Sequence, residues 1–318
     1  MTAGKDHVEI LLSTHNGAIH LNELINSIAR QDHENWSLKI RDDGSSDQTG
    51  QFIQEWKARF PGKIQILDGQ TKANIGVVRS FSILLEKSSA PYVMMADQDD
   101  VWLPGKVRLT LDAMRRRERH AQPARPVLVH TDLTMVDHEL RILAPSVWRY
   151  QGLAPGRGKA FSRIIVENTV WGCTAMLNRP LVEIVGCIPV ATIHHDWWIA
   201  LVAAAFGDIV SLSDSRILWR RHGHNESEVS GIRNVSMRLG SNVKGARQRL
   251  LELFSESRPR VLLLLERYRD KMQPFDVEAA EAFLHFPQRT PIGRRLDTCH
   301  YGLFFGSNFR NIGLLALL

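Results

Sequence analysis

Three carboxylates stand within four residues in the stretch Ala96-Asp97-Gln98-Asp99-Asp100-Val101-Trp102. The apolar residues 92–96 lead into them and are typical of a short buried strand. Carboxylates crowded at a strand end repel one another unless a positive charge lies between them. A divalent cation holding a phosphorylated ligand would supply this charge, because Mg²⁺ binds one or two carboxylates together with phosphate oxygens. The alternative is a helix start with Asp99 or Asp100 as the N-cap.

Short apolar runs alternate with segments of helical spacing in the part of the chain that leads to this stretch. Repeated strand–helix units predict an α/β fold, with a mostly parallel sheet and helices on both faces. In such folds ligands bind beyond the carboxyl ends of the strands. We expect strands over 8–13, 38–41, 64–67 and 92–96, and helices over 20–31, 49–60 and 78–88.

Polar residues follow three of these strands. They are Thr14-His15-Asn16-Gly17, Asp42-Asp43-Gly44-Ser45 and Asp97-Gln98-Asp99. Because the carboxyl ends of parallel strands lie at one edge of a sheet, we expect the three segments to converge on one crevice. This convergence favours the cation site over the helix start.

The later part of the chain has a less regular pattern. Residues 127–130, 209–212 and 216–220 favour short strands, and 196–206 favour an apolar helix. The tail from 233 onward has helical spacing and 14 Lys and Arg against 8 Asp and Glu, which accounts for the whole net charge of +6. We therefore expect one domain over 1–232, with halves 1–105 and 106–232, and a basic helical region over 233–318.

The composition is that of an ordinary globular protein, with 318 residues of which 44% are hydrophobic and 23% charged. Three cysteines without paired spacing argue against a disulfide framework or a zinc cluster, and they suit a reducing compartment. The N-terminus lacks a signal-peptide pattern, and no apolar stretch approaches the roughly 20 residues that a membrane span needs. These features predict a cytoplasmic protein.

Several segments follow one another as they do in a known family. Leu12-Ser13-Thr14-His15-Asn16-Gly17, Arg41-Asp42-Asp43-Gly44-Ser45-Ser46-Asp47 and Asn74-Ile75-Gly76 precede the acidic stretch. With them the chain resembles the family 2 inverting glycosyltransferases of the GT-A fold over most of its length. The segments that resemble the bacterial rhamnosyltransferase branch are Trp171-Gly172-Cys173-Thr174, His195-Asp196-Trp197-Trp198 and Arg221-His222-Gly223-His224-Asn225.

The resemblance implies a nucleotide-diphosphate sugar donor and a divalent metal ion, Mg²⁺ or Mn²⁺. Asp99 is the implied metal ligand with Asp97 beside the metal or the ribose, and Asp100 is open for the same role. His222 is a further implied member of the metal site, with His224 as its rival. Helix caps and plain turns are the alternatives for the donor residues. Donor contacts are implied for Ser13, Thr14, Asn16, Asp42, Asp43, Asn74, Gly76, Arg79 and Asp97.

One carboxylate must take the proton of the acceptor hydroxyl when an inverting transfer occurs. The resemblance places this general base at Asp196, directly before two tryptophans. The alternative is an N-cap aspartate on an apolar core helix. The residues implied on the acceptor side are Trp171, Gly172, Cys173, His195, Trp197 and Trp198.

The implied activity is transfer of a sugar from a dTDP- or UDP-sugar, in this branch L-rhamnose from dTDP-L-rhamnose. The implied acceptor is a saccharide or lipid-linked saccharide in bacterial surface polysaccharide synthesis. A sugar-phosphate nucleotidyltransferase is an alternative, but we expect it to carry a glycine-rich loop where this chain has residues 13–16. A non-catalytic carbohydrate-binding protein is another. A dehydrogenase is disfavoured, since no Gly-x-Gly-x-x-Gly follows the first strand.

The basic tail interleaves arginines with leucines. This pattern fits an anionic membrane surface, which would make the protein peripheral on the inner face of the cytoplasmic membrane. A helical cap or a homodimer interface fits equally well. No recognised nucleic-acid-binding motif is present, so we do not expect nucleic acid as a partner.

Overall fold

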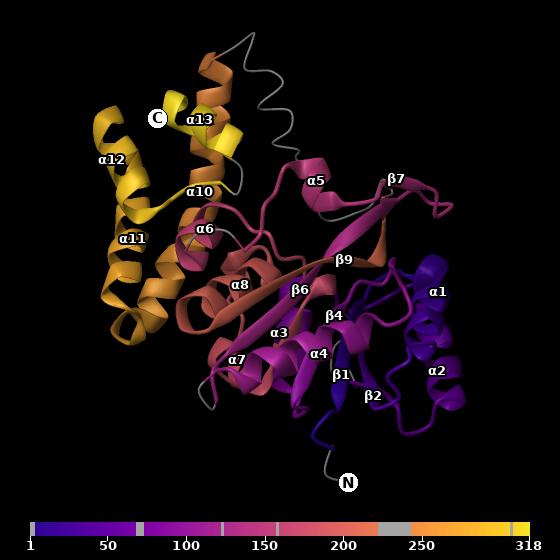
Figure 1. Cartoon of the computed structure of the whole chain (residues 1–318). Coiled ribbons are helices and arrows are strands. Elements are labelled where there is room, and N and C mark those ends of the chain that lie inside the picture. The colour runs from indigo at the N-terminus through magenta and orange to yellow at the C-terminus, as the bar shows by residue number, and fades with distance from the viewer. Residues whose placement is uncertain (1–3, 68–72, 122–123, 157–158, 222–242, 306–307) are drawn as a thin grey trace.

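The computed structural model describes residues 4–67, 73–121, 124–156, 159–221, 243–305 and 308–318 (Figure 1). Its described strands form one mixed sheet in the order β3-β2-β1-β4-β8-β6-β9-β5, and β7 pairs with β6. The strands are β1 (Val8–Thr14), β2 (Trp36–Asp42), β3 (Ile64–Ile66), β4 (Tyr92–Ala96), β5 (Val101–Trp102), β6 (Val127–Val136), β7 (Ile142–Ala144), β8 (Met176–Asn178) and β9 (Asp208–Arg220).

The strands β3, β2, β1 and β4 run parallel to one another, as the alternating pattern predicts. Their register places Thr14 beside Asp42 and Leu12 beside Ala96, so β1, β2 and β4 end at the same edge of the sheet. The expected α/β architecture is therefore confirmed in this half. The helices that connect these strands are α1 (Ala18–Ala29), α2 (Thr49–Arg59) and α3 (Val77–Glu86).

The other half of the sheet is mixed rather than parallel. β8 pairs antiparallel with β4 and β6, β5 pairs antiparallel with β9, and β9 runs parallel to β6. The strand expected over 127–130 extends to Val136, and the segments 209–212 and 216–220 belong to one strand, β9. Register shifts on both sides of Asp132 accommodate the irregular residues between those two segments.

The helix that follows the acidic stretch begins later than an aspartate cap would require. It is α4 (Lys106–Arg119), and its N-cap residue is Gly105, whose φ is 78°. The residues between the aspartates and this helix form β5, which pairs with β9. The alternative of Asp99 or Asp100 as a helix N-cap is therefore wrong, because the residues that follow them pair as a strand instead of forming the first turn of a helix.

Alternate residues of the central strands bury into two different cores. In β1, Leu11 packs into one core, while Ile10 and Leu12 pack into the other. This is the twofold periodicity of a strand that is covered on both faces. The remaining helical elements before the tail are α5 (Val147–Gln151), α6 (Ala160–Val166), the short helix η1 (Gly172–Thr174), α7 (Arg179–Val185), η2 (Val190–Thr192) and α8 (His195–Phe206).

The C-terminal helices pack against the second half of the sheet domain, beside α6 and α8 and away from α1 and α2 (Figure 1). Val261 and Leu264 share one hydrophobic core with Trp198 and Ile199 of α8. The boundary expected near residue 232 lies outside the described residues. No helix among the described residues is long and apolar enough to span a membrane. The elements are α10 (Val243–Tyr268), η3 (Arg269–Lys271), α11 (Pro274–Leu284), η4 (Phe286–Gln288), α12 (Pro291–Tyr301) and α13 (Asn308–Leu317).

Candidate active site

The polar residues that follow β1 and β2 are joined by hydrogen bonds. Thr14 Oγ1 donates to Asp42 Oδ1 at 3.3 Å, and the N–H of Asn16 donates to Ser45 Oγ at 2.9 Å. The Ser45 hydroxyl in turn donates to Asp42 Oδ1 at 2.5 Å. Ser13, the residue before this group, is half-buried at the same end of β1. The predicted convergence of these two strand ends is therefore confirmed.

Gln98 connects the acidic stretch to the end of β1. Its Oε1 accepts a hydrogen bond from the His15 N–H at 2.9 Å, and its Nε2 donates to the His15 carbonyl at 3.0 Å. A Cβ on Gly17 would lie only 2.3 Å from the same Oε1, so a larger residue at position 17 would displace the Gln98 side chain. The end of β4 thus meets the ends of β1 and β2 through the hydrogen bonds of Gln98 to the backbone of His15.

Asp43 supports the loop that precedes α3. Its Oδ1 accepts from Arg41 Nη1 at 2.6 Å and from the Ile75 N–H at 2.9 Å, and its Oδ2 accepts from the Gly76 N–H at 2.8 Å. Burial opposes the charge of Asp43, but these hydrogen bonds outweigh it and lower the pKa of its carboxyl. Both oxygens are engaged within the protein, so in this structure Asp43 positions the loop 74–76.

Asn74 and Arg79 lie on the exposed side of that loop. Asn74 Oδ1 accepts a hydrogen bond from the Gly76 N–H at 2.9 Å, and Gly76 has a φ of 87°, a backbone conformation that favours glycine. Arg79 follows in the first turn of α3. The side chains of Asn74 and Arg79 are thus exposed, whereas the carboxylate of Asp43 is buried.

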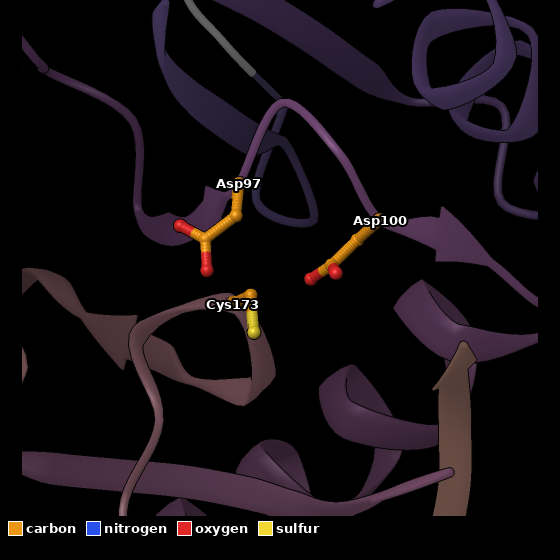
Figure 2. A group of neighbouring side chains, drawn as sticks. All are labelled: Asp97, Asp100 and Cys173. Atoms are coloured by element: carbon orange, nitrogen blue, oxygen red, sulfur yellow. The ribbon is translucent and has the colours of Figure 1, made fainter. Parts of the chain in front are cut away.

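The three aspartates of the acidic stretch have different surroundings. Asp97 and Asp99 are half-buried, whereas Asp100 is only 1% exposed. One oxygen each of Asp97 and Asp100 and the sulfur of Cys173 all lie within 4.8 Å of one another. Figure 2 shows these three side chains directed toward a common point. Burial, and after it the charges of Asp99 and Asp97, raise the pKa of Asp100 well above its ordinary value.

Arg220, at the end of β9, holds the backbone of the acidic stretch. Its Nε donates to the Asp99 carbonyl at 3.0 Å, and its Nη1 donates to the His138 carbonyl at 2.6 Å. Its Nη2 forms an ion pair with Glu23 of α1. His222, expected in the metal site two residues further on, lies outside the described residues.

Lys106, the first residue of α4, follows the acidic stretch in the chain and has a fully buried side chain. Its Nζ is 3.8 Å from the centroid of the Trp102 ring. Burial lowers the pKa of Lys106 to about 7, although the nearby Cys173, Asp100 and Asp97 oppose this shift. A buried lysine therefore contributes to the electrostatic balance of the cluster.

Asp196 lies within the first turn of α8, whose N-cap is His194. The Gly172 N–H donates to Asp196 Oδ2 at 3.3 Å, and the Trp197 N–H donates to Oδ1 at 2.6 Å. Asp196 is half-buried. It is therefore not the N-cap of this helix, and its carboxylate is held in place by two backbone donors.

His195 packs closely behind this carboxylate. Its ring stacks on Phe81 with centroids 4.2 Å apart. A Cβ on Gly172 would lie 2.8 Å from His195 Nε2, so glycine is needed at this contact. Burial lowers the pKa of His195, although the charge of Asp196 opposes this shift. The neutral imidazole is thus favoured beside Asp196.

The tryptophans expected on the acceptor side fall into two groups. Trp171 and Trp197 are half-buried, and Trp197 Nε1 donates to the Ile164 carbonyl at 2.6 Å. Trp198 is 0% exposed within the hydrophobic core, and Cys173 is also buried. Of these four residues, only Trp171 and Trp197 offer surface to an acceptor in this structure.

The segment of Gly172 and Cys173 joins the two parts of the site. Gly172 donates its N–H to Asp196, and the next residue, Cys173, directs its sulfur toward Asp97 and Asp100. Two neighbouring residues of η1 therefore contact the candidate base on one side and the acidic stretch on the other. The arrangement brings the Asp196 carboxylate and the acidic stretch to the two sides of one short helix.

Four residues that shape this site were not expected from the sequence as site residues. Gln98 lies inside the acidic stretch and could have been considered from its position there. The others had no specific signal, because each lies among apolar or basic neighbours and acts through a contact distant in sequence. They are Lys106, Arg220 and Arg260, the last of which lies with its guanidinium carbon 3.7 Å from the centroid of the Trp197 ring.

Comparison with known proteins identifies the family. The model described as Glycosyl transferase family 2 matches residues 9–185. This match covers more than half of the chain, so the chain belongs to glycosyl transferase family 2 and is a glycosyltransferase. Family membership favours this activity over the nucleotidyltransferase alternative.

Curated relatives cover different shares of the chain. An uncharacterised protein of Mycobacterium tuberculosis is 24% identical over 81% of this chain and 72% of its own length. The putative teichuronic acid biosynthesis glycosyltransferase TuaG of Bacillus subtilis is 25% identical over 56% of this chain and 65% of its own. The dTDP-rhamnosyl transferase RfbG of Shigella flexneri is 29% identical over 32% of this chain and 36% of its own.

Solved structures share the fold. The TarS fragment of S. aureus in complex with UDP-GlcNAc has a TM-score of 0.54 and 16% identity, covering 93% of this chain and 80% of that one. The mannosyltransferase PcManGT of Pyrobaculum calidifontis, in complex with GDP-Man and Mn²⁺, has a TM-score of 0.52 and 16% identity, covering 98% and 84%. The GT-A fold expected from the sequence is confirmed.

Proposed function

We propose that the protein is an inverting glycosyltransferase that moves a sugar from a nucleotide-diphosphate donor to a saccharide acceptor in bacterial surface polysaccharide synthesis. The observation that carries this proposal is the joint placement of Asp196 and the acidic stretch on either side of Gly172 and Cys173. An inverting displacement requires a proton acceptor beside a site that neutralises the leaving group. The substrate class is supported by two relatives, of which TuaG is named a putative teichuronic acid biosynthesis glycosyltransferase and RfbG a dTDP-rhamnosyl transferase.

The proposed donor is dTDP-L-rhamnose, from which L-rhamnose is transferred, because the relative RfbG is named a dTDP-rhamnosyl transferase. Ser13, Asn16 and Asp42 are the proposed nucleoside contacts at the strand ends, whereas the predicted Thr14 is only 1% exposed and donates its hydroxyl to Asp42. The exposed Asn74 and Arg79 face the solvent side of the same edge and suit the sugar diphosphate, because a guanidinium binds phosphate oxygens in pairs. Gly76, Asp43 and Asp97 are the remaining proposed donor residues. Asp43 acts indirectly, by holding the loop that contains Gly76 through hydrogen bonds.

A divalent ion, Mg²⁺ or Mn²⁺, would be held by the aspartates of the acidic stretch and would act as a Lewis acid for the diphosphate leaving group. The residues fit such an ion, because Asp100 is a buried carboxylate with an unsatisfied oxygen among the described residues. Asp99, which the sequence favours as the ligand, is half-buried beside it. PcManGT was solved with Mn²⁺, which is in keeping with this proposal.

Asp196 is the proposed general base. Its two oxygens accept from Gly172 and Trp197, which fixes the carboxylate while leaving it half-exposed. As the acceptor oxygen attacks the anomeric carbon, its proton passes to Asp196, and the bond to the nucleoside diphosphate breaks. Trp197 follows Asp196 in the chain and Trp171 precedes Gly172, which donates to Asp196, and we propose that these two half-buried tryptophans contact the acceptor.

The arginines of the C-terminal tail bear on its proposed docking to an anionic membrane. Many arginines expected to face lipid headgroups instead make contacts inside the protein, among them Arg258 with the Leu284 carbonyl and Arg267 with the Cys187 carbonyl. Exposed Ile292 and Leu296 on α12 are apolar groups that a membrane or a second copy could cover. We also propose a lipid-linked acceptor, an anionic membrane surface and a second copy of this chain as partners.

A hydrolysis and transfer screen over nucleotide sugars with Mg²⁺ or Mn²⁺ tests the function. We expect turnover of a dTDP- or UDP-sugar by the unaltered chain. Asp99→Ala should lose metal-dependent donor binding, whereas Asp196→Ala should bind the donor but fail to transfer. Transfer by Asp196→Ala at the unaltered rate would exclude this residue as the base.

A further inference from the structure

Both ends of the acidic stretch are bonded to elements that precede it in the chain. Gln98, near the start of the stretch, exchanges two hydrogen bonds with the backbone of His15 at the end of β1. Trp102, at the end of the stretch, donates its backbone N–H to Ser27 Oγ of α1 at 3.0 Å. Residues 99 and 100 lie between these two anchors, so a further contact has to fix their position.

Arg220 contacts the part of the stretch that lies between the anchors. Its Nε donates to the Asp99 carbonyl at 3.0 Å, and its backbone N–H donates to Asp100 Oδ1 at 3.4 Å. The hydrogen bond within the turn itself, from the Asp100 N–H to the Asp97 carbonyl, is long at 3.4 Å. The position of Asp99 and Asp100 therefore depends on a residue of β9 that follows Asp100 by 120 residues.

Glu23 of α1 forms an ion pair with Nη2 of the same arginine. The Arg220 side chain is 3% exposed, whereas that of Glu23 is 45% exposed. A buried guanidinium requires a paired charge and hydrogen-bond acceptors, because burial removes it from water. Glu23 and Ser27 are four residues apart and so lie on one face of α1. This face contacts Arg220 through Glu23 and the backbone of Trp102 through Ser27.

We propose that Glu23 and Arg220 are positioning residues that fix Asp99 and Asp100 and thereby set the metal dependence of donor binding. Neither residue contacts the ion itself. Replacing residues that support metal ligands typically changes metal affinity by about 10- to 100-fold. The effect on donor binding rests on the proposed function, whereas the positioning of the acidic stretch does not.

Two substitutions distinguish positioning from charge. Arg220→Lys keeps the positive charge, but an ammonium lacks the planar fork with which the guanidinium reaches Asp99, His138 and Glu23. Glu23→Ala keeps the arginine and removes this ion pair. Because Glu23 is partly exposed, the second change opens little space in the core. An effect shared by both variants would come from the contact between them rather than from either charge alone.

Matched controls are available on the same elements of the fold. Arg216→Lys makes the same change four residues earlier on β9, where the arginine is exposed and pairs with Asp214 at 3.9 Å. Glu55→Ala removes an exposed carboxylate from α2, which accepts a hydrogen bond from Gln51. Among the described residues, the side chains of Arg216 and Glu55 bond to residues outside 97–102.

Hydrogen exchange of the ligand-free full chain, followed by mass spectrometry, tests the positioning directly. Arg220→Lys and Glu23→Ala should raise backbone exchange in residues 97–102 and leave residues 36–42 of β2 unchanged, because the loosened contact is local. The two controls should exchange as the unaltered protein does. Circular dichroism and the melting temperature establish that each variant is folded. Unchanged exchange over 97–102 in both variants would overturn the proposal.

Calorimetric titration with dTDP and UDP, each with and without Mn²⁺, tests the consequence for donor binding. We expect Mn²⁺ to tighten nucleotide binding by the unaltered protein, and Arg220→Lys and Glu23→Ala to reduce this tightening by about tenfold or more. Their affinity without the metal should remain unchanged, because the proposed nucleoside contacts lie at the ends of β1 and β2.

The ratio of the two affinities separates positioning from a general loss of structure. If each variant lost affinity by the same factor with and without Mn²⁺, the proposal would be wrong. If exchange rose over 97–102 but Mn²⁺ had no effect on nucleotide binding by the unaltered protein, the positioning role would stand. The metal-assisted part of the proposed function would then fail instead.

Discussion

The guanidinium carbon of Arg260 lies 3.7 Å from the centroid of the Trp197 ring. Arg260 belongs to α10, and its side chain is almost fully buried between this helix and the sheet domain. Trp197 follows Asp196 directly and donates its N–H to that carboxylate. A helix near the C-terminus therefore contacts the residue next to the proposed base.

Arg260→Met should impair transfer by displacing Trp197. A buried cation–π contact contributes about 2 kcal/mol, so we expect a loss of stability of this order together with reduced transfer. Binding of dTDP or UDP, measured by calorimetry, should remain unchanged because the nucleotide residues lie on other elements. Arg260→Lys should recover part of the transfer rate.

Arg258→Met is the matched control for this change, since Arg258 lies on the same helix but donates to the Leu284 carbonyl of α11. It should affect stability without a selective effect on transfer. Equal loss of transfer in both variants would show that α10 acts only through overall stability.

Gly17→Ala should disturb the contact between the acidic stretch and β1. The new Cβ would lie 2.3 Å from Gln98 Oε1, and overpacking of this kind costs about 1–3 kcal/mol. Adding Gln98→Ala should relieve the clash and recover part of the free energy of unfolding, measured in urea.

Gly50→Ala is the control, because a Cβ there meets nothing within 4 Å. Within α2 it should be neutral or stabilising by up to about 1 kcal/mol. If Gly17→Ala were equally harmless, Gln98 would not be held as the structure shows.

Gly172→Ala should lower transfer more than stability. Its Cβ would lie 2.8 Å from His195 Nε2 and 3.6 Å from Asp196 Cβ, so it would displace the proposed base. A displacement of about 1 Å can reduce a rate by roughly 100-fold. The ratio of the transfer rate to the fraction folded checks this expectation, and a ratio equal to that of the unaltered protein would contradict it.

Asp43→Asn should remove a pH-dependent part of the stability. Hydrogen bonds lower the pKa of Asp43 in the folded state below its ordinary value of 3.8. A lowered pKa stabilises the fold fully above the unfolded value, and this contribution is lost as the pH falls through 3.8 toward the folded value.

The free energy of unfolding of the unaltered protein should therefore exceed that of Asp43→Asn at pH 7, by about 1.5–3 kcal/mol for a hydrogen-bonded charge. The difference should shrink below pH 4 or so as the carboxyl becomes protonated. Asp214→Asn, at a half-exposed position, serves as the control and should show little effect at either pH. A difference that stayed constant with pH would mean that the charge of Asp43 is unimportant.

The elements that local patterns define were predictable. Short apolar runs place β1 and β4 correctly, because strands buried on both faces are largely apolar, and Leu38 and Ile40 place β2 although buried Lys39 and Arg41 alternate with them. Once parallel pairing is assumed, the meeting of Thr14, Asp42 and Gln98 at one edge follows from the connection lengths.

The mixed half of the sheet was harder to predict. β6 is a ten-residue strand whose later part contains buried polar residues, of which Asp132 accepts a hydrogen bond from Ser146 and Thr134 pairs with Ser215, both distant in sequence. Periodicity carries no information about such partners. For the same reason the sequence pattern predicts two short strands where the structure has the single strand β9.

Residue types and order along the chain were enough to identify the family, the acidic stretch and the candidate base, because chemistry of this kind needs carboxylates at strand ends and helix starts. Only the tertiary structure decides which of these groups lie close together. The Asp100 side chain faces Cys173, and Asp43 accepts a hydrogen bond from the loop before α3. Trp198 is buried, whereas Trp197 lies against Arg260. Such contacts join residues far apart in the chain, and their positions depend on how two cores and a C-terminal helix pack together.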